Sequence, residues 1–598
     1  MVNSQSPTMK KLLVLLFLCT GHLCQAQVFT SPWSFHSGWG NDDRIFSTTF
    51  DKDGNIYSTG EFQGIVDFDP GPGTYNLSTP PGFLQQDAFV QKLDSAGNLL
   101  WVKQFGAPID SRQLVNHIEV DDSNNVYLLG AYFHQIQFSP NDTVWGNISL
   151  QFPRSFLVKL DSQGNVRWGM AWNSPLAADR IYLYDMTIDS IGNMFLFGFF
   201  GGTIDFDPTS NSVISRSSLG GSDDPVALRV SSSGSVKKVR VFNTTNNGYG
   251  RYLGTDKKGN IFLSGRYTGS FDFDNGPGTD IRTSYTDGEN FITRVDTALD
   301  YVWVITSTIF PFRLDANELG EVFTYGAFGG TRDFDPGPGV SNLTSQGSSD
   351  IYFSKFDLGG NFQWAKNFGG LSPEGASEVV VTKSQILLMG TFKDSIDLST
   401  GPGKIWARSN GGQDAFVLLL DSLGNYRGHA SFGGTGDDEI WSGAFSEKDN
   451  VVIGGQFYNT MDIDPTLGVQ NVTSAGAKDM FLVKMALCKK DHLSYADTTC
   501  GSYTLPSGSR TFFQSGTYID TLASISGCDS ILTIQATILP AINPTLTLED
   551  YGFHCRATGS NLTYQWINCQ TGLVIQNATD SIYLPVYNGQ FAVRVSNG

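Results

Sequence analysis

The chain has 598 residues and is acidic, with 39 lysines and arginines against 58 aspartates and glutamates. Nucleic acids and anionic membrane surfaces both attract clustered basic residues, so this charge balance argues against either as a partner. The length allows several domains. We interpret the acidity as a means of keeping an exported protein in solution.

The first 26 residues have the order of a secretory signal peptide. A basic pair at residues 10–11 precedes the apolar run 12–18, and a small-residue end follows at Ala26. This order is typical of a signal peptide, and we expect cleavage after Ala26. A lipoprotein signal through Cys19 or Cys24 is disfavoured because Leu precedes each. No later stretch approaches the roughly 18 apolar residues of a membrane span. The sequence therefore predicts a secreted or outer-surface protein without a transmembrane span.

A nine-residue pattern returns seven times between residues 27 and 488. Its fullest copy, residues 54–62, reads Gly-Asn-Ile-Tyr-Ser-Thr-Gly-Glu-Phe. The central glycines recur every 61 to 70 residues, at Gly60, Gly130, Gly198, Gly265, Gly326, Gly390 and Gly455. A near-constant period of this size indicates a repeat protein in which each copy is one supersecondary unit.

Each repeat contains four short β-rich runs. In the second repeat they are residues 117–120, 126–132, 155–160 and 166–172. Turns rich in Gly, Asn and Asp separate the runs, and no helical period intervenes. Four antiparallel strands per repeat is the arrangement of a propeller blade. We predict an all-β, seven-bladed β-propeller over residues 27–488.

The two ends of the repeat region complement each other. The seventh repeat lacks its fourth strand, because the sequence departs from the pattern after Met485. Residues 33–36, followed by an acidic pair, match the fourth strand of the first repeat at residues 101–105. We expect this N-terminal strand to complete the last blade and so to remove two open sheet edges. An open, non-closing array is the alternative.

Asp-x-Asp pairs recur between the second and third strands and are the candidate metal ligands. Residues i and i+2 of a strand project to one face, so two carboxylates could join loop carbonyls around Ca²⁺. The competing interpretation is that the aspartates cap the turn while the residue between them packs in the core. The turn that begins at Asp51 also resembles a calcium loop, but no Glu closes it and a hairpin is favoured. The candidates are Asp67, Asp69, Asp205, Asp207, Asp272, Asp274, Asp333, Asp335, Asp462 and Asp464.

Two of these motifs carry a resemblance to a known family. Residues 67–73 read Asp-Phe-Asp-Pro-Gly-Pro-Gly, and residues 93–101 fit Leu-Asp-x-x-Gly-Asn-x-x-Trp. The chain resembles secreted bacterial β-propeller repeat proteins with Ig-like C-terminal modules, which are cargo of the type IX secretion route of Gram-negative bacteria. The similarity covers about residues 27–488. It implies a secreted or surface protein of a group mostly without known activity.

The region after the repeats is divided into two modules. Residues 489–540 resemble a small β module of the same secreted proteins, and this resemblance implies a disulfide between Cys500 and Cys528. Residues 541–598 resemble an Ig-like β-sandwich with Trp566 in its core, but they are short for that fold. We expect this module to be truncated. The pairing of the other cysteines stays open, at Cys488, Cys555 and Cys569.

No catalytic constellation is recognisable, so the sequence predicts no catalytic and no cofactor-binding residue. The seven histidines show no zinc spacing, and neither a nucleophile elbow nor a phosphate loop occurs. Ca²⁺ at the Asp pairs is the single cofactor suggested. We expect a monomeric, non-enzymatic scaffold for binding or adhesion, whose ligand is an unknown protein or glycan. The alternative is a glycoside hydrolase or lyase with carboxylates in the propeller mouth.

Overall fold

The computed structural model describes residues 29–596 with short gaps, so the predicted signal peptide lies outside the described residues. The gaps are residues 39, 81–85, 107–110, 139–144, 147–151, 175, 177, 190, 210–212, 220–222, 275, 277, 310, 402, 467, 488–491, 501, 523–529, 540–544, 550–551 and 558–560.

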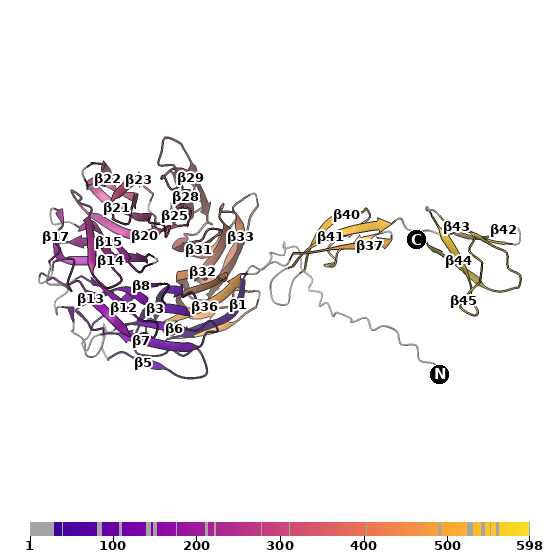
Figure 1. Cartoon of the computed structure of the whole chain (residues 1–598), viewed down its shortest axis with the longest axis horizontal. Coiled ribbons are helices and arrows are strands. Elements are labelled where there is room, and N and C mark those ends of the chain that lie inside the picture. The colour runs from indigo at the N-terminus through magenta and orange to yellow at the C-terminus, as the bar shows by residue number, and fades with distance from the viewer. Residues whose placement is uncertain are drawn as a thin grey trace. The chain divides into compact units, whose positions relative to one another are not determined.

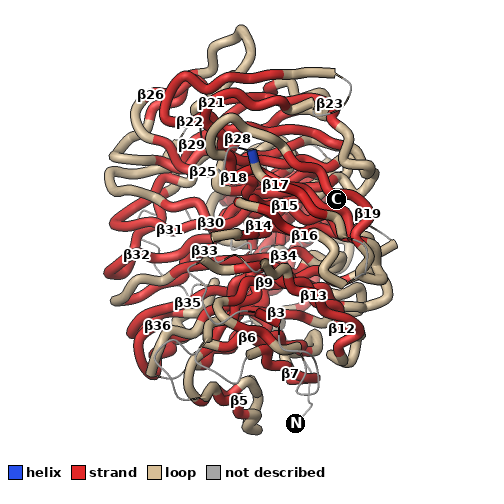
Figure 2. The backbone as a smooth tube through the Cα atoms, turned by 90° about the vertical axis from the view of Figure 1, so that its left-hand side faces the viewer, coloured by secondary structure: helices blue, strands red, loops and turns tan. Residues whose placement is uncertain are grey.

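The chain divides into two compact units, Met1–Cys488 and Lys489–Gly598. Both are built from β-strands, and the described part of the chain contains no α-helix; the short blue segment in Figure 2 is a 3₁₀ turn at Leu219. The described residues therefore contain no helix with the length and apolarity needed to cross a membrane.

The larger unit consists of seven four-stranded antiparallel repeats within the described residues. The strands of repeats 1 to 4 are β2 (Arg44–Phe50), β3 (Ile56–Phe62), β6 (Asp87–Leu93) and β7 (Leu99–Phe105); β8 (Gln113–Val120), β9 (Val126–Tyr132), β12 (Arg154–Leu160) and β13 (Val166–Ala171); β14 (Arg180–Ile188), β15 (Met194–Gly201), β18 (Asp223–Val230) and β19 (Val236–Val241); β20 (Gly248–Thr255), β21 (Ile261–Asp272), β22 (Ile281–Val295) and β23 (Tyr301–Ser307). Repeats 5 to 7 consist of β24 (Arg313–Ala316), β25 (Val322–Phe328), β28 (Asp350–Phe356) and β29 (Phe362–Phe368); β30 (Gly375–Val381), β31 (Gln385–Asp397), β32 (Trp406–Asp421) and β33 (Tyr426–Gly434); β34 (Glu439–Phe445), β35 (Asn450–Asp462), β36 (Asn471–Leu487) and β1 (Phe29–Ser37).

The repeats follow one another around a common centre, which gives a propeller-like arrangement (Figure 1). The first strand of each repeat contacts the first strand of the next, in the order β2, β8, β14, β20, β24, β30 and β34. The series returns to its start because β34 also contacts β2. These seven first strands are therefore the innermost elements, and their side chains surround the centre.

The N-terminal strand β1 belongs to the seventh repeat, as the sequence predicted. It pairs antiparallel with β36, from Phe29 opposite Leu487 to Ser37 opposite Met480. Figure 1 shows the indigo start of the chain beside the orange end of the repeat region. This strand supplies the outer position that β7 occupies in repeat 1.

The repeated glycine is explained by a bulge in the innermost strand. In repeat 1 the pairing of β2 with β3 shifts between Ile45 and Ser47, so that Phe46 is an extra residue. The shift brings the carbonyl of Arg44 so close to Gly60 that an added Cβ would collide with its oxygen. The same collision with an innermost-strand carbonyl would occur at Gly130, Gly198, Gly265, Gly390 and Gly455. Glycine is required here because two backbones approach closely.

The Asp-x-x-Gly-Asn turn and the following Trp join neighbouring repeats. Asp94 Oδ1 accepts hydrogen bonds from the N–H groups of Ala96 and Asn98, which caps the turn between β6 and β7. Gly97 lies against the ring of Trp33, where an added Cβ would stand 2.9 Å from the indole. The Trp33–Gly97 contact joins repeat 7 to repeat 1, and the pairs Trp101–Gly164, Trp168–Gly234, Trp303–Gly360 and Trp364–Gly424 join other neighbours.

Small two-stranded ribbons project between the second and third strands. They are separate hairpins in four repeats and continue β21–β22, β31–β32 and β35–β36 in the others. The separate ribbons are β4 (Ile65–Asp67) with β5 (Asn76–Ser78), β10 (Gln135–Ile136) with β11 (Trp145–Gly146), β16 (Thr203–Asp205) with β17 (Ser215–Ser217), and β26 (Thr331–Asp333) with β27 (Asn342–Thr344).

The smaller unit contains several small sheets. One three-stranded sheet contains β37 (His492–Cys500), β40 (Gly516–Leu522) and β41 (Ser530–Leu539), and a two-stranded sheet pairs β38 (Tyr503–Thr504) with β39 (Thr511–Phe512). A second three-stranded sheet contains β42 (Thr545–Glu549), β43 (Gly552–Arg556) and β46 (Ile582–Tyr583). A third contains β44 (Thr563–Asn568), β45 (Leu573–Val574) and β47 (Phe591–Ser596). Trp566 is fully buried and stacks on Tyr583. Cys555, buried, and Cys569, exposed, are free thiols. The predicted Cys500–Cys528 disulfide involves Cys528, which lies outside the described residues.

Candidate functional site

The predicted Asp-x-Asp residues cap the ribbon turns with their side chains. Asp67 Oδ1 accepts hydrogen bonds from the N–H groups of Asp69 and Tyr75, at 3.0 and 2.8 Å. Asp69 Oδ1 in turn accepts the N–H of Gly71 at 2.8 Å, while its Oδ2 packs against Gly73. The first aspartate of each other pair accepts two N–H groups in the same way, at Asp205, Asp272, Asp333 and Asp462. The second aspartate accepts one further donor, at Asp207, Asp274, Asp335 and Asp464.

These contacts give the Asp pairs a structural role in the turns. In each pair, one oxygen of the first carboxylate already holds two N–H groups of its own ribbon. No set of three or more His, Cys, Asp or Glu side chains positioned to hold a metal occurs within the described ranges. Calcium at these aspartates therefore stays a prediction.

A ring of dissimilar side chains surrounds the centre of the propeller-like unit. Each member pairs with the same position of the second strand, just after the bulge where one is present. We call these residues the central ring. Its seven members, one from each repeat, are Ser47, His117, Asp185, Tyr252, Arg313, Glu378 and Ser442. Turns and core repeat from copy to copy, whereas this position changes residue type, which makes it the best candidate for a specific site.

His117 and Asp185 form an ion pair within the central ring. His117 Nδ1 lies 3.0 Å from Asp185 Oδ1, and Asp185 Oδ2 accepts the N–H of Leu253 at 2.9 Å. Burial disfavours the charged imidazolium and by itself lowers the pKa of His117. The negative charges of Asp185 and then Glu119 outweigh this effect and raise the pKa to about 10. The ring therefore carries an imidazolium at neutral pH.

The opposite side of the central ring is organised around Arg313. Its guanidinium lies over the ring of Tyr252, 4.8 Å from the centroid, and its Nε stands 3.2 Å from Glu378 Oε2. Burial raises the pKa of Glu378 although Arg313 opposes the shift. Burial also raises the pKa of nearby Asp315 to about 7, against the N–H groups of Val381 and Ala316 that its carboxylate accepts. The site thus combines fixed charges with a carboxyl group that titrates near neutrality.

Aromatic residues extend the site along the first strands of repeats 3 and 4. Tyr182 and Tyr184 lie with their ring centroids 4.3 Å apart, and both contact Phe199. Tyr249 meets Phe199 edge-on at 5.0 Å, and Arg251 lies over Tyr184 at 4.6 Å from the centroid. We call these five residues the aromatic patch. All five are partly exposed, so their faces are available for stacking with a ligand.

Two bulge residues present buried polar atoms that no group of the described residues satisfies. Within that part of the chain, the indole N–H of Trp441 and the side-chain oxygen of Asn116 have no hydrogen-bond partner. Trp441 also contacts Phe46, the bulge residue of repeat 1, edge-on at 5.8 Å. A donor and an acceptor left open beside the central ring suit water or a polar ligand group there.

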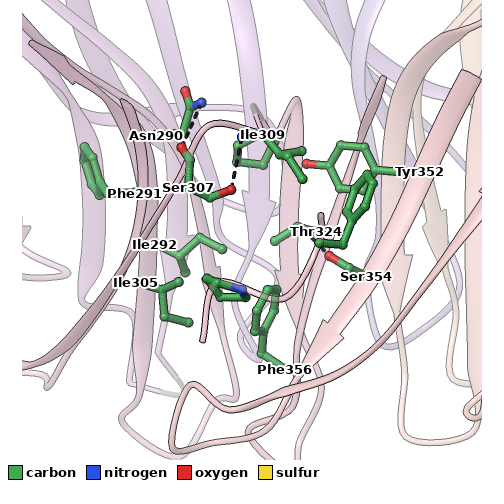
Figure 3. A pocket seen from close by; sticks show the side chains of 13 residues that line it. Asn290, Phe291, Ile292, Ile305, Ser307, Ile309, Thr324, Tyr352, Ser354 and Phe356 are labelled. Atoms are coloured by element: carbon green, nitrogen blue, oxygen red, sulfur yellow. Dashed lines mark hydrogen bonds between the residues drawn. The ribbon is translucent and has the colours of Figure 1, made fainter. Parts of the chain in front are cut away.

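A separate hollow lies between repeats 4 and 5 (Figure 3). It has an empty volume of about 380 Å³ and is lined mainly by apolar side chains such as Phe291, Ile292 and Phe356. Ser307 Oγ accepts the N–H of Ile309 at 3.0 Å, and the hydroxyls of Thr324 and Ser354 are 2.6 Å apart. Asn290 Oδ1 is the one buried side-chain acceptor of this lining without a hydrogen-bond partner among the described residues, so the hollow offers few open polar groups and the central ring, with its fixed charges, is favoured as the recognition site.

The central ring and the aromatic patch were not predicted from the sequence. The usable signal was the residue thirteen places before six of the repeated glycines, such as Ser47 before Gly60, His117 before Gly130 and Asp185 before Gly198, and twelve places before Gly390. The repeat pattern itself identifies only residues that stay the same, whereas this position holds six residue types in seven repeats, with serine at both Ser47 and Ser442.

Comparisons with known proteins give limited similarity. No protein-family model matches the chain. The regulatory protein FlaEY of Caulobacter vibrioides is 27% identical over 140 residues, which is 22% of this chain and 14% of that protein. The match therefore spans about one seventh of that relative's length.

Solved structures with similar strand arrangements have low identity. A protein of unknown function from Dyadobacter fermentans is 11% identical, with a TM-score of 0.32 over 77% of this chain and 99% of that chain. The WD40 domain of Neurospora crassa Pan2 is 9% identical, with a TM-score of 0.32 over 77% and 97%. A protein of unknown function from Bacteroides caccae is 10% identical, with a TM-score of 0.25 over 57% and 94%. The fold described above therefore rests on the strand pairing of this chain itself.

Proposed function

We propose that this chain is a secreted or cell-surface, non-enzymatic binding scaffold. In this proposal the seven repeats are the blades of one closed propeller, exported by the type IX route, and the residues after 488 are a small β module and an Ig-like module. The ligand is a protein or glycan that contacts the central ring and the aromatic patch. The observation that carries the proposal is that side chains change from repeat to repeat at one inward position while the turns and the core recur.

The chemistry of the site supports recognition by fixed polar edges and stacking. The imidazolium of His117 and the guanidinium of Arg313 are each held by a carboxylate, so their positions are set before a ligand arrives. Tyr184 with Arg251 offers a flat face of the kind that sugar rings and aromatic side chains contact.

Binding can be tested on the purified chain with a glycan array and with labelled outer-surface proteins. Tyr184→Ala and Arg251→Ala should each weaken binding at least about tenfold, as expected for central contacts. Tyr75→Ala is the matched control, because Tyr75 is an exposed aromatic residue on a ribbon turn. Binding that survives both patch variants but falls with the control would place the ligand elsewhere and contradict the proposal.

A carbohydrate-active enzyme is the second candidate, and the raised pKa of Asp315, two residues from the ring member Arg313, favours it. A carboxyl such as Asp315, with its pKa raised to about 7, can act as a general acid when an ionised carboxylate stands nearby. Release of reducing ends from a polysaccharide panel, lost in Glu378→Gln or Asp185→Asn, would establish this function and remove the non-enzymatic one.

A further inference from the structure

Buried acidic residues recur where one repeat meets the next. In the third strand of several repeats an aspartate pairs with the Phe two places after the repeated glycine, and a second residue precedes the first strand of the following repeat by one or two places. At three consecutive junctions both positions are acidic, namely Asp350 with Glu374, Asp414 with Asp438, and Asp479 with Asp43. All six side chains are 4% exposed or less. We call these the acid pairs.

Backbone contacts hold the two acids of each pair side by side. The N–H of Glu374 donates to the carbonyl of Ser349, the residue before Asp350, at 3.3 Å. Asp438 likewise donates to Gln413 at 2.7 Å, and Asp43 to Lys478 at 2.8 Å. In each pair the backbone N–H of the second acid therefore bonds to the residue directly before the first acid, so the two side chains start from neighbouring points of the backbone.

A Gly-Gly step lies beside the carboxylates at two of the junctions. Gly369 lies flat against the carboxylate of Asp350, and the N–H of Gly370 donates to Glu374 Oε1 at 2.9 Å. At the next junction Gly433 lies against Asp414, and the N–H of Gly434 donates to Asp438 Oδ2 at 2.9 Å. An added Cβ at Gly369 or Gly433 would collide with the neighbouring carboxylate, and Asp350 Oδ2 also accepts the side-chain N–H of Asn367 at 3.0 Å.

One carboxylate oxygen in each acid pair has no partner. These atoms are Glu374 Oε2, Asp414 Oδ1 and Asp479 Oδ1, and they are the only buried carboxylate oxygens without a hydrogen bond among the described residues. An ionised carboxylate buried beside another one is costly unless a cation neutralises it. Burial raises the pKa of Asp350 and the positive charge of Lys404 opposes this rise, but the ammonium group of Lys404 forms an ion pair with Asp397 at 2.6 Å and does not bind the acid pair.

At two other junctions one of the two positions is not acidic, and hydrogen bonds within the protein hold the charged side chains there. In repeat 3 the residue before β20 is the neutral Asn247, and the oxygens of Asp224 accept the N–H of Leu219 and both the N–H and hydroxyl of Thr244. In repeat 2, Arg154 occupies the aspartate position. Its buried guanidinium donates to the carbonyls of Ser174, Leu176 and Asp179 and to the side chain of Asn173. A permanent cation among oxygen atoms thus fills one junction.

We propose that each acid pair binds a calcium ion between adjacent repeats. Two carboxylates balance the charge of one divalent ion, and the remaining ligands are carbonyl oxygens of the junction loops. An all-oxygen, irregular set of this kind suits Ca²⁺, whereas Mg²⁺ demands a near-ideal octahedron and zinc prefers nitrogen and sulfur. The three sites are separate from the central ring and from the ribbon aspartates.

The test measures bound calcium and melting temperature on the full chain at neutral pH. Equilibrium dialysis should show that Glu374→Gln and Asp414→Asn each remove one calcium ion. Calcium should raise the melting temperature of the wild type over that in chelator, and each variant should lose part of this rise. In chelator Asp414→Asn should melt at or above the wild type, because a buried charge has been removed, and Glu374→Gln should melt close to the wild type, because the raised pKa of Glu374 already leaves its side chain mainly protonated.

Two sets of controls make the result decisive. Asp224→Asn changes an equivalent buried aspartate whose oxygens are all engaged, so it should leave calcium binding unchanged. Asp69→Asn and Asp274→Asn test the ribbon aspartates, and calcium lost with these variants would place the ion there instead. The proposal is overturned if the chain binds no calcium, or if binding survives both Glu374→Gln and Asp414→Asn.

Discussion

Single residues in this protein divide into those that the backbone requires and those that the site uses. Six of the seven repeated glycines belong to the first kind, since a carbonyl of the innermost strand occupies the place of their Cβ. His117 belongs to the second, since its charge depends on one neighbour, Asp185. A substitution in each kind gives a distinct result.

We predict that Gly198→Ala destabilises the protein, because the new Cβ would collide with the carbonyl oxygen of Tyr182. The expected loss is about 1–3 kcal/mol in the free energy of unfolding, as for other overpacked sites. Chemical denaturation measures it. Gly401→Ala is the control, since no atom lies within 4 Å of its Cβ position. Equal stability of the two variants would contradict this account of the repeat.

We predict that Asp185→Asn lowers the pKa of His117 by roughly 1–3 units, the effect of one adjacent charge. Because the folded pKa of about 10 lies above the ordinary value of 6.5, this pair stabilises the wild type fully below about pH 6.5. The stabilisation is lost as the pH rises through 10. Histidine NMR titration reads the pKa directly, and an unchanged value in the variant would show that Asp185 is not its cause.

At the scale of elements, the outer-strand Trp and the turn Gly join each repeat to the next. Trp101 donates its Nε1–H to the carbonyl of Ser162 in repeat 2, and Trp33 occupies the same position between repeats 7 and 1. The closure thus uses the same contact as the internal junctions.

We predict that Trp33→Ala and Trp101→Ala destabilise the protein to a similar degree, by about 2 kcal/mol for partly buried tryptophans. In an open array Trp33 would have no neighbour to stabilise, and its variant would cost nothing. Trp406→Ala, at an exposed tryptophan, is the control and should change stability by about 0.5 kcal/mol or less. Urea denaturation of the three variants decides between the two architectures.

Much of this element structure could be predicted from the sequence, because it depends on local and repeated patterns. The runs 126–132 and 166–172 predict β9 and β13 almost to the residue. The missing strand after Met485 and the spare one at Trp33 predict the pairing of β1 with β36.

The central ring and the acid pairs could not be read from those patterns. Membership of the ring is set by a bulge, which shifts the register by one residue and leaves no mark of its own in the sequence. The acid pairs join residues such as Asp350 and Glu374, which come together only when one repeat packs on the next. Both features exist in the assembled unit and not in any single repeat.

At the scale of the whole molecule, the three acid pairs make stability depend on pH and calcium together. Burial raises the pKa of Glu374 to about 8, of Asp438 to about 7 and of Asp414 to about 6 in the absence of a metal ion. Coulombic repulsion from Asp350 on Glu374, and from Asp414 and Asp437 on Asp438, adds to the rise.

We predict that in chelator the melting temperature falls as the pH rises from about 4 to 8. The folded state binds more protons than the unfolded chain across this window, so stability decreases with pH until the folded pKa values are passed. Calcium should flatten this slope by replacing the protons. Differential scanning calorimetry over the pH series measures it, and the same slope with and without calcium would contradict the prediction.

The pairing of β1 with β36 also has a consequence for the order in which the protein is completed. Thr30 donates a side-chain hydrogen bond to Ala486, 456 positions later in the chain. Contacts between such distant residues form slowly, and a chain made from its N-terminus has β1 long before its partner exists. The first strand to emerge is therefore the last to find its place, and until the seventh repeat has followed, the nascent protein keeps two unpaired edges.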